Sequence, residues 1–354
     1  MKKKPINLGK LIRKTVFYIF VTTLGVGIIL PAFFLVSLSF LSTAEAYQFP
    51  LPLLPSLKNE FRLSYGEKGY MLSVYNNFEK EYETVLDTSD LEKMSVYMKS
   101  QLGSPVSINR LQILTTQLDA SGGDAIRFSA RKNLLINYDT FFKVTRDAVP
   151  ALIRSLQICA MTIVISLSIG GMAGYAFARY IFAGRDALKF SVLFVRMFPG
   201  VAIALPMVII LANMGFYDRP IGLSLVYSVG SIALTVWITA SIFLGIPVSL
   251  EEAAQVFGAT KAQAFIRITF PLALPGLAAA AMYAFLGAWN ETVSAIILTQ
   301  FNPTFSVVVY QTLLGAVGQV NLAAAGGLAM AIPSVIFTFF IRRYINQMWG
   351  GITI

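Results

Sequence analysis

A single acidic residue lies within an apolar run near the C-terminal end of the sequence. This residue is Glu291, and polar and aromatic residues stand around it: Trp289, Asn290, Thr292 and Ser294. A charged side chain in such a run is costly unless it faces protein or water, so Glu291 is a candidate for function. Its carboxylate, with the neighbouring amide and hydroxyl groups, can hydrogen-bond a polar solute. The alternative is that Glu291 lies near an aqueous interface or pairs with a partner chain.

Another concentration of polar residues lies at 247–271, between two apolar runs. Ser249, followed three residues later by Glu252, predicts a capping box at the start of a helix. Gly258 suits the left-handed backbone conformation that ends many helices. The prediction is a first short helix that closes at a glycine corner.

A second short helix is predicted to follow this corner at once. Thr260 and Gln263 have the spacing of another capping box, and Pro271 is expected to break the pattern before the next apolar run. The whole stretch is therefore predicted to form a helix, a glycine corner and a second helix, held between two apolar segments.

The pattern of residues in this stretch resembles the EAA loop of binding-protein-dependent ABC import permeases. The residues that match are Glu252, Ala253, Ala254, Gly258, Ile268 and Pro271, and Phe270 stands where the family usually has leucine. In that family the loop is cytoplasmic, docks into a cleft on the ATP-binding subunit and carries nucleotide-driven motion into the membrane. The resemblance implies an ATPase-coupling site made of Glu251, Glu252, Ala253, Ala254, Gly258, Ala259, Thr260 and Pro271. An ordinary amphipathic helix between two spans is the alternative.

The composition of the chain is that of a membrane protein. Of its 354 residues, 56% are hydrophobic and only 13% are charged, which is too apolar for a soluble domain of this size. Several apolar runs approach or exceed the ~20 residues that a helix needs to cross a bilayer. The chain has no histidine, and its one cysteine, Cys159, falls in an apolar run. We therefore expect no internal disulfide, no catalytic triad and no metal site.

The net charge of +10 is distributed in a way that predicts membrane topology. Basic residues gather before the first span, after the second, in the 247–271 stretch and at the C-terminal end: Lys2, Lys3, Lys4, Lys10, Arg13, Lys14, Arg179, Arg185, Lys189, Lys261, Arg267, Arg342 and Arg343. Because cytoplasmic loops are enriched in lysine and arginine, we expect these segments and both termini on the cytoplasmic side of a cell membrane. Topology and contact with the lipid bilayer thus account for the charge, and no nucleic-acid partner is expected.

The transmembrane segments are expected to fall into two parts of the chain. A cytoplasmic tail over 1–14 precedes a first transmembrane helix over 15–41. A cleaved signal peptide is the alternative, but the run is much longer than the ~7–15 residues of a signal core. A five-helix core is expected over 150–350, with spans at 156–177, 190–214, 222–244, 272–298 and 322–344. Within it, Gly170, Gly171 and Gly174 form a small-residue face suited to close helix packing.

Residues 45–145 differ in character, because charges are dense and no run is long enough to span a membrane. We expect an extracytoplasmic α+β domain, inserted between the first and second transmembrane helices. Residues 78–102 are predicted to form a helix, with a break and a new cap within it at Asp87-Thr88-Ser89-Asp90. Residues 106–114 and 125–136 are predicted to form strands, with a turn at 121–124. The segment contacts a solute-binding protein or a partner permease, or is a packing insertion, and the sequence favours neither.

Two further segments resemble the sugar-permease branch of the same family. They are residues 175–185, after the second span, and Trp289-Asn290-Glu291. The resemblance implies an α-helical polytopic membrane protein with six transmembrane helices in the type I ABC importer fold. It also implies a translocation path at Trp289, Asn290, Glu291, Thr292 and Ser294. An aromatic ring against a sugar face, with amide and carboxylate groups for the hydroxyls, is suitable chemistry for a carbohydrate.

The hypothesis that follows is a permease subunit of an ATP-driven importer for a sugar or oligosaccharide, which is a transport subunit and not an enzyme. The resemblance implies three partners: a dimeric ATP-binding subunit, a second permease and an extracytoplasmic solute-binding protein. The sequence has no Gly-x-x-x-x-Gly-Lys-Ser/Thr loop, so we expect no cofactor on this chain and place ATP and Mg²⁺ on a separate ATPase chain. An ion-driven secondary transporter, an ABC permease for another solute and a membrane sensor are the alternatives.

Overall fold

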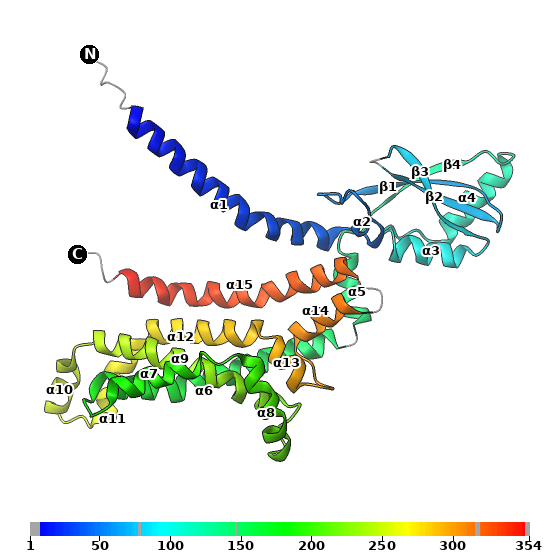
Figure 1. Cartoon of the computed structure of the whole chain (residues 1–354). Coiled ribbons are helices and arrows are strands. Elements are labelled where there is room, and N and C mark those ends of the chain that lie inside the picture. The colour runs from blue at the N-terminus through cyan, green and yellow to red at the C-terminus, as the bar shows by residue number, and fades with distance from the viewer. Residues whose placement is uncertain (1–7, 77–78, 146, 316–318, 351–354) are drawn as a thin grey trace, which may run out of the picture. The chain divides into compact units, whose positions relative to one another are not determined.

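The computed structural model describes residues 8–76, 79–145, 147–315 and 319–350, and these form two compact units. One unit comprises Met1–Val144 and Thr312–Leu328, and the other comprises Thr145–Gln311 and Ala329–Ile354 (Figure 1). The expected tail over 1–14 lies partly outside the described residues, and its described part belongs to a helix.

The unit that begins at Thr145 has helices as its regular elements in the residues that the structure describes. Its helices are α6 (Ala148–Arg179), α7 (Arg185–Val195), α8 (Gly200–Asn213), α9 (Pro220–Gly245), α10 (Val248–Val256), α11 (Lys261–Ala264), a π-helix (Phe265–Thr269), α12 (Phe270–Asn290) and α13 (Val293–Leu298). Two more helices, α14 (Phe305–Leu314) and α15 (Val320–Gly350), each belong partly to both units. The long helices α6, α9 and α12 pack along one another.

Five helices in the described residues are long and apolar enough to cross a membrane. They cover Arg13–Phe40, Ala148–Arg179, Pro220–Gly245, Lys261–Asn290 and Val320–Tyr344. A sixth span is possible if α7 and α8, which meet at a bend of 86°, count as one broken span. The six spans expected from the sequence therefore correspond to five helices and one bent pair.

Two of the expected spans differ from the structure in ways that proline explains. The run 190–214 is not one straight helix, because Pro199 disfavours the helical conformation in the residue before it and begins a new helix. Pro271 does not break the chain, since the helical stretch Lys261–Asn290 runs through it, with the π-helix Phe265–Thr269 directly before α12. The helical stretch is instead continuous to Asn290, where the expected span over 272–298 ends early.

Small residues bring the long helices of the bundle close together, as expected. A Cβ atom added to Gly170 would lie 2.8 Å from the Cβ of Thr235 on α9, and one added to Gly174 would overlap Thr239. Gly276 on α12 meets Ile242 of α9 in the same way. Close backbone approach of this kind favours helix association in lipid, where no hydrophobic force drives helices together.

The other unit consists of one long helix and a small α+β domain. Its elements are α1 (Leu8–Phe40), α2 (Thr43–Ala46), β1 (Lys58–Tyr65), β2 (Tyr70–Asn76), β3 (Glu81–Thr88), α3 (Leu91–Ser100), α4 (Ile108–Ala120), β4 (Ile126–Arg131) and α5 (Ile136–Val144). The strands form an antiparallel sheet in the order β3-β2-β1-β4. Side chains of β1 and β2, such as Phe61 and Leu72, pack with Met94 of α3 and Leu111 of α4 in one core.

Two predictions for this domain are wrong, and both errors have a physical cause. Residues 78–102 are not helical throughout, because β3 occupies the part before the expected break. The new cap at that break is confirmed: Asp90 caps α3 by accepting hydrogen bonds from Glu92 N and Lys93 N at 2.9 and 3.2 Å. Residue 78 lies outside the described residues. The strand predicted over 106–114 is the start of helix α4. The strand at β4 is confirmed, although it is shorter than predicted, and the turn over 121–124 is confirmed.

Candidate functional site

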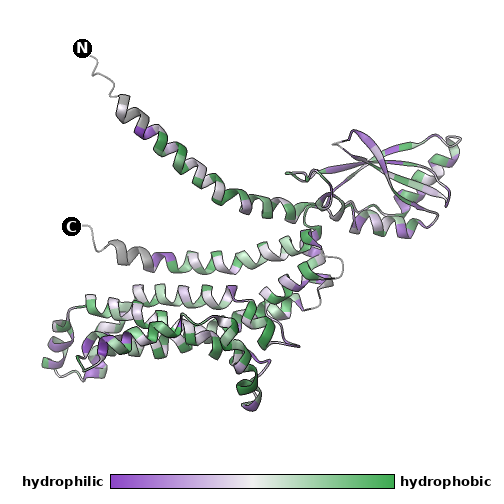
Figure 2. Ribbon diagram, viewed as in Figure 1, coloured by the Kyte–Doolittle hydropathy of each residue, from purple (hydrophilic) through white to green (hydrophobic). Residues whose placement is uncertain are grey.

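The polar stretch 247–271 forms a pair of short helices at one end of the apolar bundle, where Figure 2 shows hydrophilic residues gathered on α10 and α11. The capping box predicted at Ser249 is wrong, because α10 begins directly after Pro247 and has no side-chain cap. The second box is confirmed: Gln263 N donates to Thr260 Oγ1 at 3.2 Å, and Thr260 N donates to Gln263 Oε1 at 2.9 Å.

The corner between α10 and α11 presents exposed apolar side chains. Gly258 has a φ of +89°, which confirms the left-handed corner predicted there. The two residues before it, Val256 and Phe257, are 84% and 91% exposed. Of the other residues assigned to this site, Glu252, Ala253, Thr260 and Pro271 are exposed, and Ala254 and Ala259 are half-buried. A large exposed aromatic beside a polar helix is typical of a surface that a partner covers.

Glu251 differs from its neighbours, because its carboxylate points into the bundle. Its Oε2 accepts a hydrogen bond from the Tyr175 hydroxyl at 2.7 Å. Its Oε1 accepts one from Arg179 Nε at 2.8 Å and another from the Thr269 hydroxyl at 2.7 Å. Arg179 Nη1 also donates to the carbonyl of Phe243 at 2.8 Å. One carboxylate thus joins α10 to α6 and to the π-helix, and its arginine reaches the end of α9.

The Glu251–Arg179 pair is buried, and the Glu251 carboxylate accepts three hydrogen bonds. The two side chains are only 8% and 7% exposed, and Arg179 Nη2 lies 2.8 Å from Glu251 Oε1, close enough for an ion pair but not aligned as a hydrogen bond. Burial alone would raise the pKa of the Glu251 carboxyl. The hydrogen bonds from Tyr175, Thr269 and Arg179, with the arginine charge, outweigh burial and hold that pKa below its ordinary value.

This lowered pKa predicts that acid loosens α10. A carboxyl whose pKa is lower in the folded state stabilises that state fully above its ordinary value of 4.5 and loses the contribution as the pH falls through the lower value. Hydrogen exchange of residues 248–256, corrected for intrinsic rates, should therefore speed up between about pH 6 and about pH 3. The Glu251→Gln variant should lack this dependence, and equal protection of the wild-type chain at both values would contradict the prediction.

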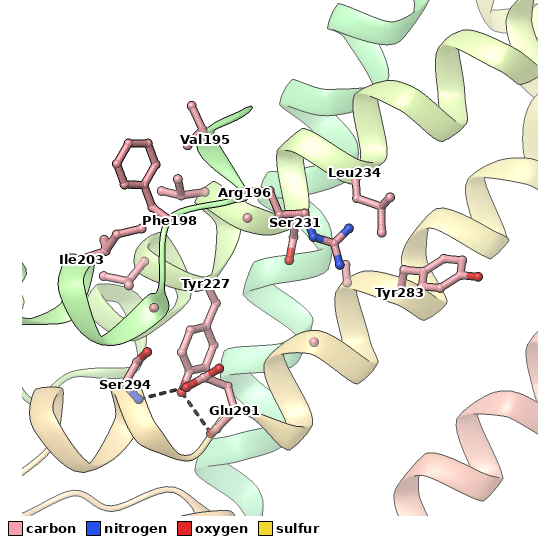
Figure 3. A pocket seen from close by; sticks show the side chains of 16 residues that line it. Val195, Arg196, Phe198, Ile203, Tyr227, Ser231, Leu234, Tyr283, Glu291 and Ser294 are labelled. Atoms are coloured by element: carbon pink, nitrogen blue, oxygen red, sulfur yellow. Dashed lines mark hydrogen bonds between the residues drawn. The ribbon is translucent and has the colours of Figure 1, made fainter. Parts of the chain in front are cut away.

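A second group of polar residues lines a cavity of about 250 Å³ within the bundle. It lies between the α7–α8 bend and helices α9, α12 and α13, and its polar lining residues are Arg196, Tyr227, Ser231, Tyr283, Glu291 and Ser294. In Figure 3 the Arg196 guanidinium lies beside Ser231, and Glu291 lies next to Tyr227. The cavity therefore offers a carboxylate, a guanidinium cation and hydroxyl groups to a solute that enters it.

Glu291 is positioned by the break between α12 and α13. Its Oε1 accepts a hydrogen bond from Ser294 N at 2.9 Å in the first turn of α13. Its backbone carbonyl accepts hydrogen bonds from the hydroxyls of Tyr227 at 3.3 Å and Ser306 at 3.1 Å. The second carboxylate oxygen has no hydrogen bond within the described residues, so one acceptor is available to a ligand.

The structure brings only two of the five expected path residues to this cavity. Glu291 and Ser294 line it. Trp289 instead is buried in the bundle core, where Nε1 donates to the carbonyl of Met330 at 2.9 Å and the ring stacks on Phe285 at 5.6 Å. Asn290 is exposed and Thr292 is half-buried, and neither belongs to the cavity lining.

Several residues of the two sites were missed at the level of sequence. Tyr175 and Arg179 stand four residues apart and so share a helix face, a spacing that could have marked them as partners of an acid. Arg196 lies in an apolar run and could have been found by the argument applied to Glu291. In the part of the chain that the structure describes, no three Asp, Glu or Cys side chains gather as a metal ion would require.

Comparisons with known proteins bear on the region that holds both sites. Residues 149–349 match the family described as "Binding-protein-dependent transport system inner membrane component". The trehalose transport system permease protein SugB of Mycobacterium tuberculosis is 35% identical over 206 residues, which are 57% of this chain and 75% of that protein. The maltodextrin transport system permease protein MalD of Streptococcus pneumoniae is 26% identical, over 68% of this chain and 88% of that protein.

A solved structure shares the fold. A chain of a bacterial ABC transporter involved in the import of the acidic polysaccharide alginate superposes with a TM-score of 0.60 at 16% identity. The match covers 97% of this chain and 100% of that chain. Identity at this level supports the architecture alone, which is that of the type I importer permeases expected from the sequence.

Proposed function

Because the chain belongs to the family of inner membrane components of binding-protein-dependent transport systems, we propose that it is the permease subunit of an ATP-driven importer of a sugar or oligosaccharide. The observation that carries the substrate class is the 35% identity to a trehalose permease over 206 residues. The partners are an ATP-binding subunit that holds ATP and Mg²⁺, a second permease and a solute-binding protein. Both termini and the α10–α11 corner are cytoplasmic, and residues 45–145 lie on the extracytoplasmic side of the membrane.

The geometry supports a mechanism in which the corner between α10 and α11 is bound to the ATPase and moves when the ATPase changes conformation. Exposed Val256, Phe257 and Glu252 supply the docking surface. Closure of the ATPase around ATP moves this surface, and the buried Glu251 carries the movement to α6 and, through Thr269, to the base of α12. Because α6, α9 and α12 pack closely, they move together and alternate the access of the path.

The test of this function is reconstitution of the chain with its ATPase, partner permease and binding protein in vesicles. Uptake of radiolabelled trehalose or maltotriose should require ATP and the ATPase chain. Uptake that persists without the ATPase and stops with an ionophore would establish an ion-driven carrier instead. ATP-dependent uptake of amino acids, without uptake of either sugar, would support an ATP-driven importer but contradict a sugar as its substrate.

The bundle cavity is expected to contribute to the path, and its charged residues allow a direct test. Glu291→Gln and Arg196→Met should each lower sugar uptake by about tenfold, since hydrogen bonds to charged groups are worth about 1.5–3 kcal/mol. Association with the ATPase should be unchanged. Asn290→Ala is the matched control, because it alters a neighbour that is exposed and does not line the cavity. Equal losses in all three variants would contradict the assignment.

Substitutions at Gly258 distinguish two effects on uptake: loss of the docking surface and strain in the backbone. Nothing lies within 4 Å of a Cβ built on Gly258, so the chain itself has room for a side chain. Strain in the left-handed conformation should cost about 1–2 kcal/mol for Gly258→Ala and less for Gly258→Asn, which tolerates that region. If a partner surface covers the corner, Gly258→Asn should lose uptake as severely as Gly258→Ala. Uptake near the wild-type rate in the asparagine variant would show that strain alone matters.

A further inference from the structure

An open cavity of about 870 Å³ lies in the α+β domain. Its walls are the segment 42–59, the end of β2, part of β3 and one side chain of α3, all of which belong to one compact unit. Ligand pockets in proteins measure about 300–1,000 Å³, so this cavity can hold several linked sugar units. The bundle cavity, at about 250 Å³, is much smaller.

We propose that this cavity is a second carbohydrate site, one that holds a neutral oligosaccharide on the domain formed by residues 45–145. Its lining residues with aromatic or hydrogen-bonding side chains include Tyr47, Gln48, Tyr75, Asn76, Glu83 and Tyr97. Tyrosine offers an apolar face for the C–H side of a sugar ring and a hydroxyl for its polar edge. The proposal rests on the proposed function only for the choice of sugar.

The charge of the lining selects against anionic ligands. Its ionisable acids are Glu45 and Glu83, and no lysine or arginine is among the lining residues. The charge of Glu45 is balanced by its ion pair with the buried Lys132, whereas Glu83 forms no ion pair within the described residues. A phosphate, a nucleotide or an acidic sugar would therefore meet the Glu83 carboxylate with no cation among the lining residues. A neutral polyol, in contrast, can donate its hydroxyl protons to these groups.

Several polar groups of the lining are available to a ligand. Within the described residues, the carboxylate of Glu83, the amide of Gln48 and the hydroxyl of Tyr97 form no hydrogen bond. Burial, with the nearby charge of Glu83, raises the pKa of Tyr97, so its phenol remains protonated and can donate. Tyr75 is held edge-on against Tyr82 of β3, with ring centroids 5.2 Å apart, so its orientation is fixed before a ligand binds.

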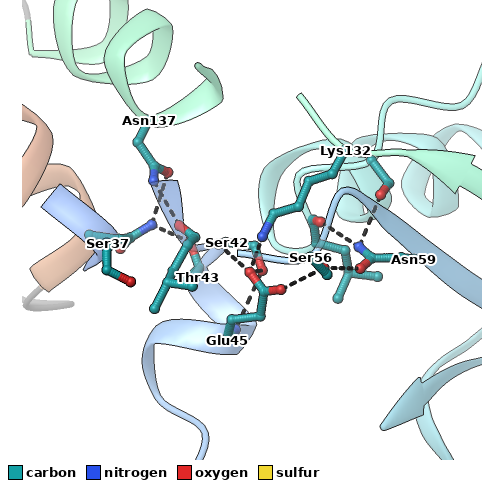
Figure 4. A network of polar contacts seen from close by, with 12 residues as sticks. Ser37, Ser42, Thr43, Glu45, Ser56, Asn59, Lys132 and Asn137 are labelled. Atoms are coloured by element: carbon teal, nitrogen blue, oxygen red, sulfur yellow. Dashed lines mark hydrogen bonds and ion pairs between the residues drawn. The ribbon is translucent and has the colours of Figure 1, made fainter. Parts of the chain in front are cut away.

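A buried polar network makes one wall of the cavity rigid (Figure 4). Glu45 pairs with Lys132, whose side chain is fully buried, and accepts hydrogen bonds from Ser42 N at 2.8 Å and Ser56 Oγ at 2.7 Å. Asn59 donates to the carbonyl of Leu102 at 2.8 Å. Because the side chains of this wall are already held in place, binding a ligand costs less conformational entropy than it would at a mobile surface.

Direct binding to the full chain in lipid nanodiscs tests the proposal. The chain should carry Glu291→Gln, which weakens the bundle cavity as a competing site. Calorimetry with maltotriose should show one bound molecule, and Glu83→Gln and Tyr97→Phe should each weaken binding by about tenfold. Glu81→Gln is the matched control, since Glu81 is also exposed on β3 but does not line the cavity. A trimer of galacturonic acid should bind far more weakly than maltotriose.

The outcomes against the proposal are equally specific. It falls if the chain binds no maltotriose, or if Glu83→Gln and Tyr97→Phe bind as well as Glu81→Gln. It also falls if these variants lose only the capture of the solute-binding protein, because the cavity would then be a protein-docking surface. Sugar uptake is measured alongside in the assembled transporter with Glu291 unchanged: intact uptake without binding to this cavity overturns the second site and leaves the proposed function standing.

Discussion

Sugar uptake is expected to fall by more than about tenfold when Glu251 is replaced with alanine, although the chain still reaches the membrane. The substitution leaves Arg179 buried without its partner and removes the acceptor for Tyr175 and Thr269. Breaking a buried pair from one side costs about 3–5 kcal/mol, which is ample to detach a nine-residue helix. Vesicle uptake and hydrogen exchange of residues 248–269 measure the two consequences.

A double variant distinguishes positioning from a direct contact with the ATPase. Arg179→Met combined with Glu251→Met removes both charges, so the unpaired cation of the single variant is absent and α10 should regain much of its protection. Glu252→Ala, one residue away and exposed, should leave the exchange of residues 248–269 unchanged. If α10 in the Glu251→Ala variant exchanged its amide hydrogens as slowly as in the wild-type chain, the hydrogen bonds and ion pair of Glu251 would not be what holds α10 in place.

Replacing Phe257 with aspartate is expected to abolish co-purification of the ATPase. Phe257 is almost fully exposed beside Val256 at the corner, and an aromatic ring of this kind is a frequent hot spot of binding. A carboxylate at this position would lose its hydration in the interface without gaining a partner, so the side chain would weaken binding of the ATPase instead of strengthening it. The measurement is the amount of ATPase retained on the tagged chain after gentle solubilisation.

Phe301→Asp is the control for this loss. Phe301 is 77% exposed in the loop between α13 and α14, which Figure 1 shows at the other end of the bundle from α10. Its substitution should leave the ATPase bound. Retention of the ATPase by Phe257→Asp, or equal loss with Phe301→Asp, would contradict the docking surface.

The apolar spans and the coupling loop could be predicted from sequence because their signals are local. Runs of about 20 apolar residues mark a span wherever they occur. The corner at Gly258 and the box from Thr260 to Gln263 depend on residues three or four apart. Ser249 has the same spacing to Glu252, but Pro247 begins the helix earlier, so the serine lies inside the first turn.

The features that sequence missed depend on contacts between distant residues. Tyr82, Val85 and Leu86 fit a helical period, and only pairing with β2 makes them a strand, as Tyr75 opposite Tyr82 shows. The partners of Glu251 lie on α6 and the π-helix, far from it along the chain. The spacing around Trp289 gave no sign that the ring turns into the bundle core and away from the cavity.

Site-specific crosslinking at Phe257 tests the central claim most directly. Cys159 is buried, so a Phe257→Cys substitution introduces a readily accessible thiol at the corner. A benzophenone attached there should crosslink to the ATP-binding subunit in the reconstituted transporter, and the yield should change when ATP binds. Crosslinks that reach only lipid, or that form equally well from Phe301→Cys, would contradict the assignment of this corner to the ATPase.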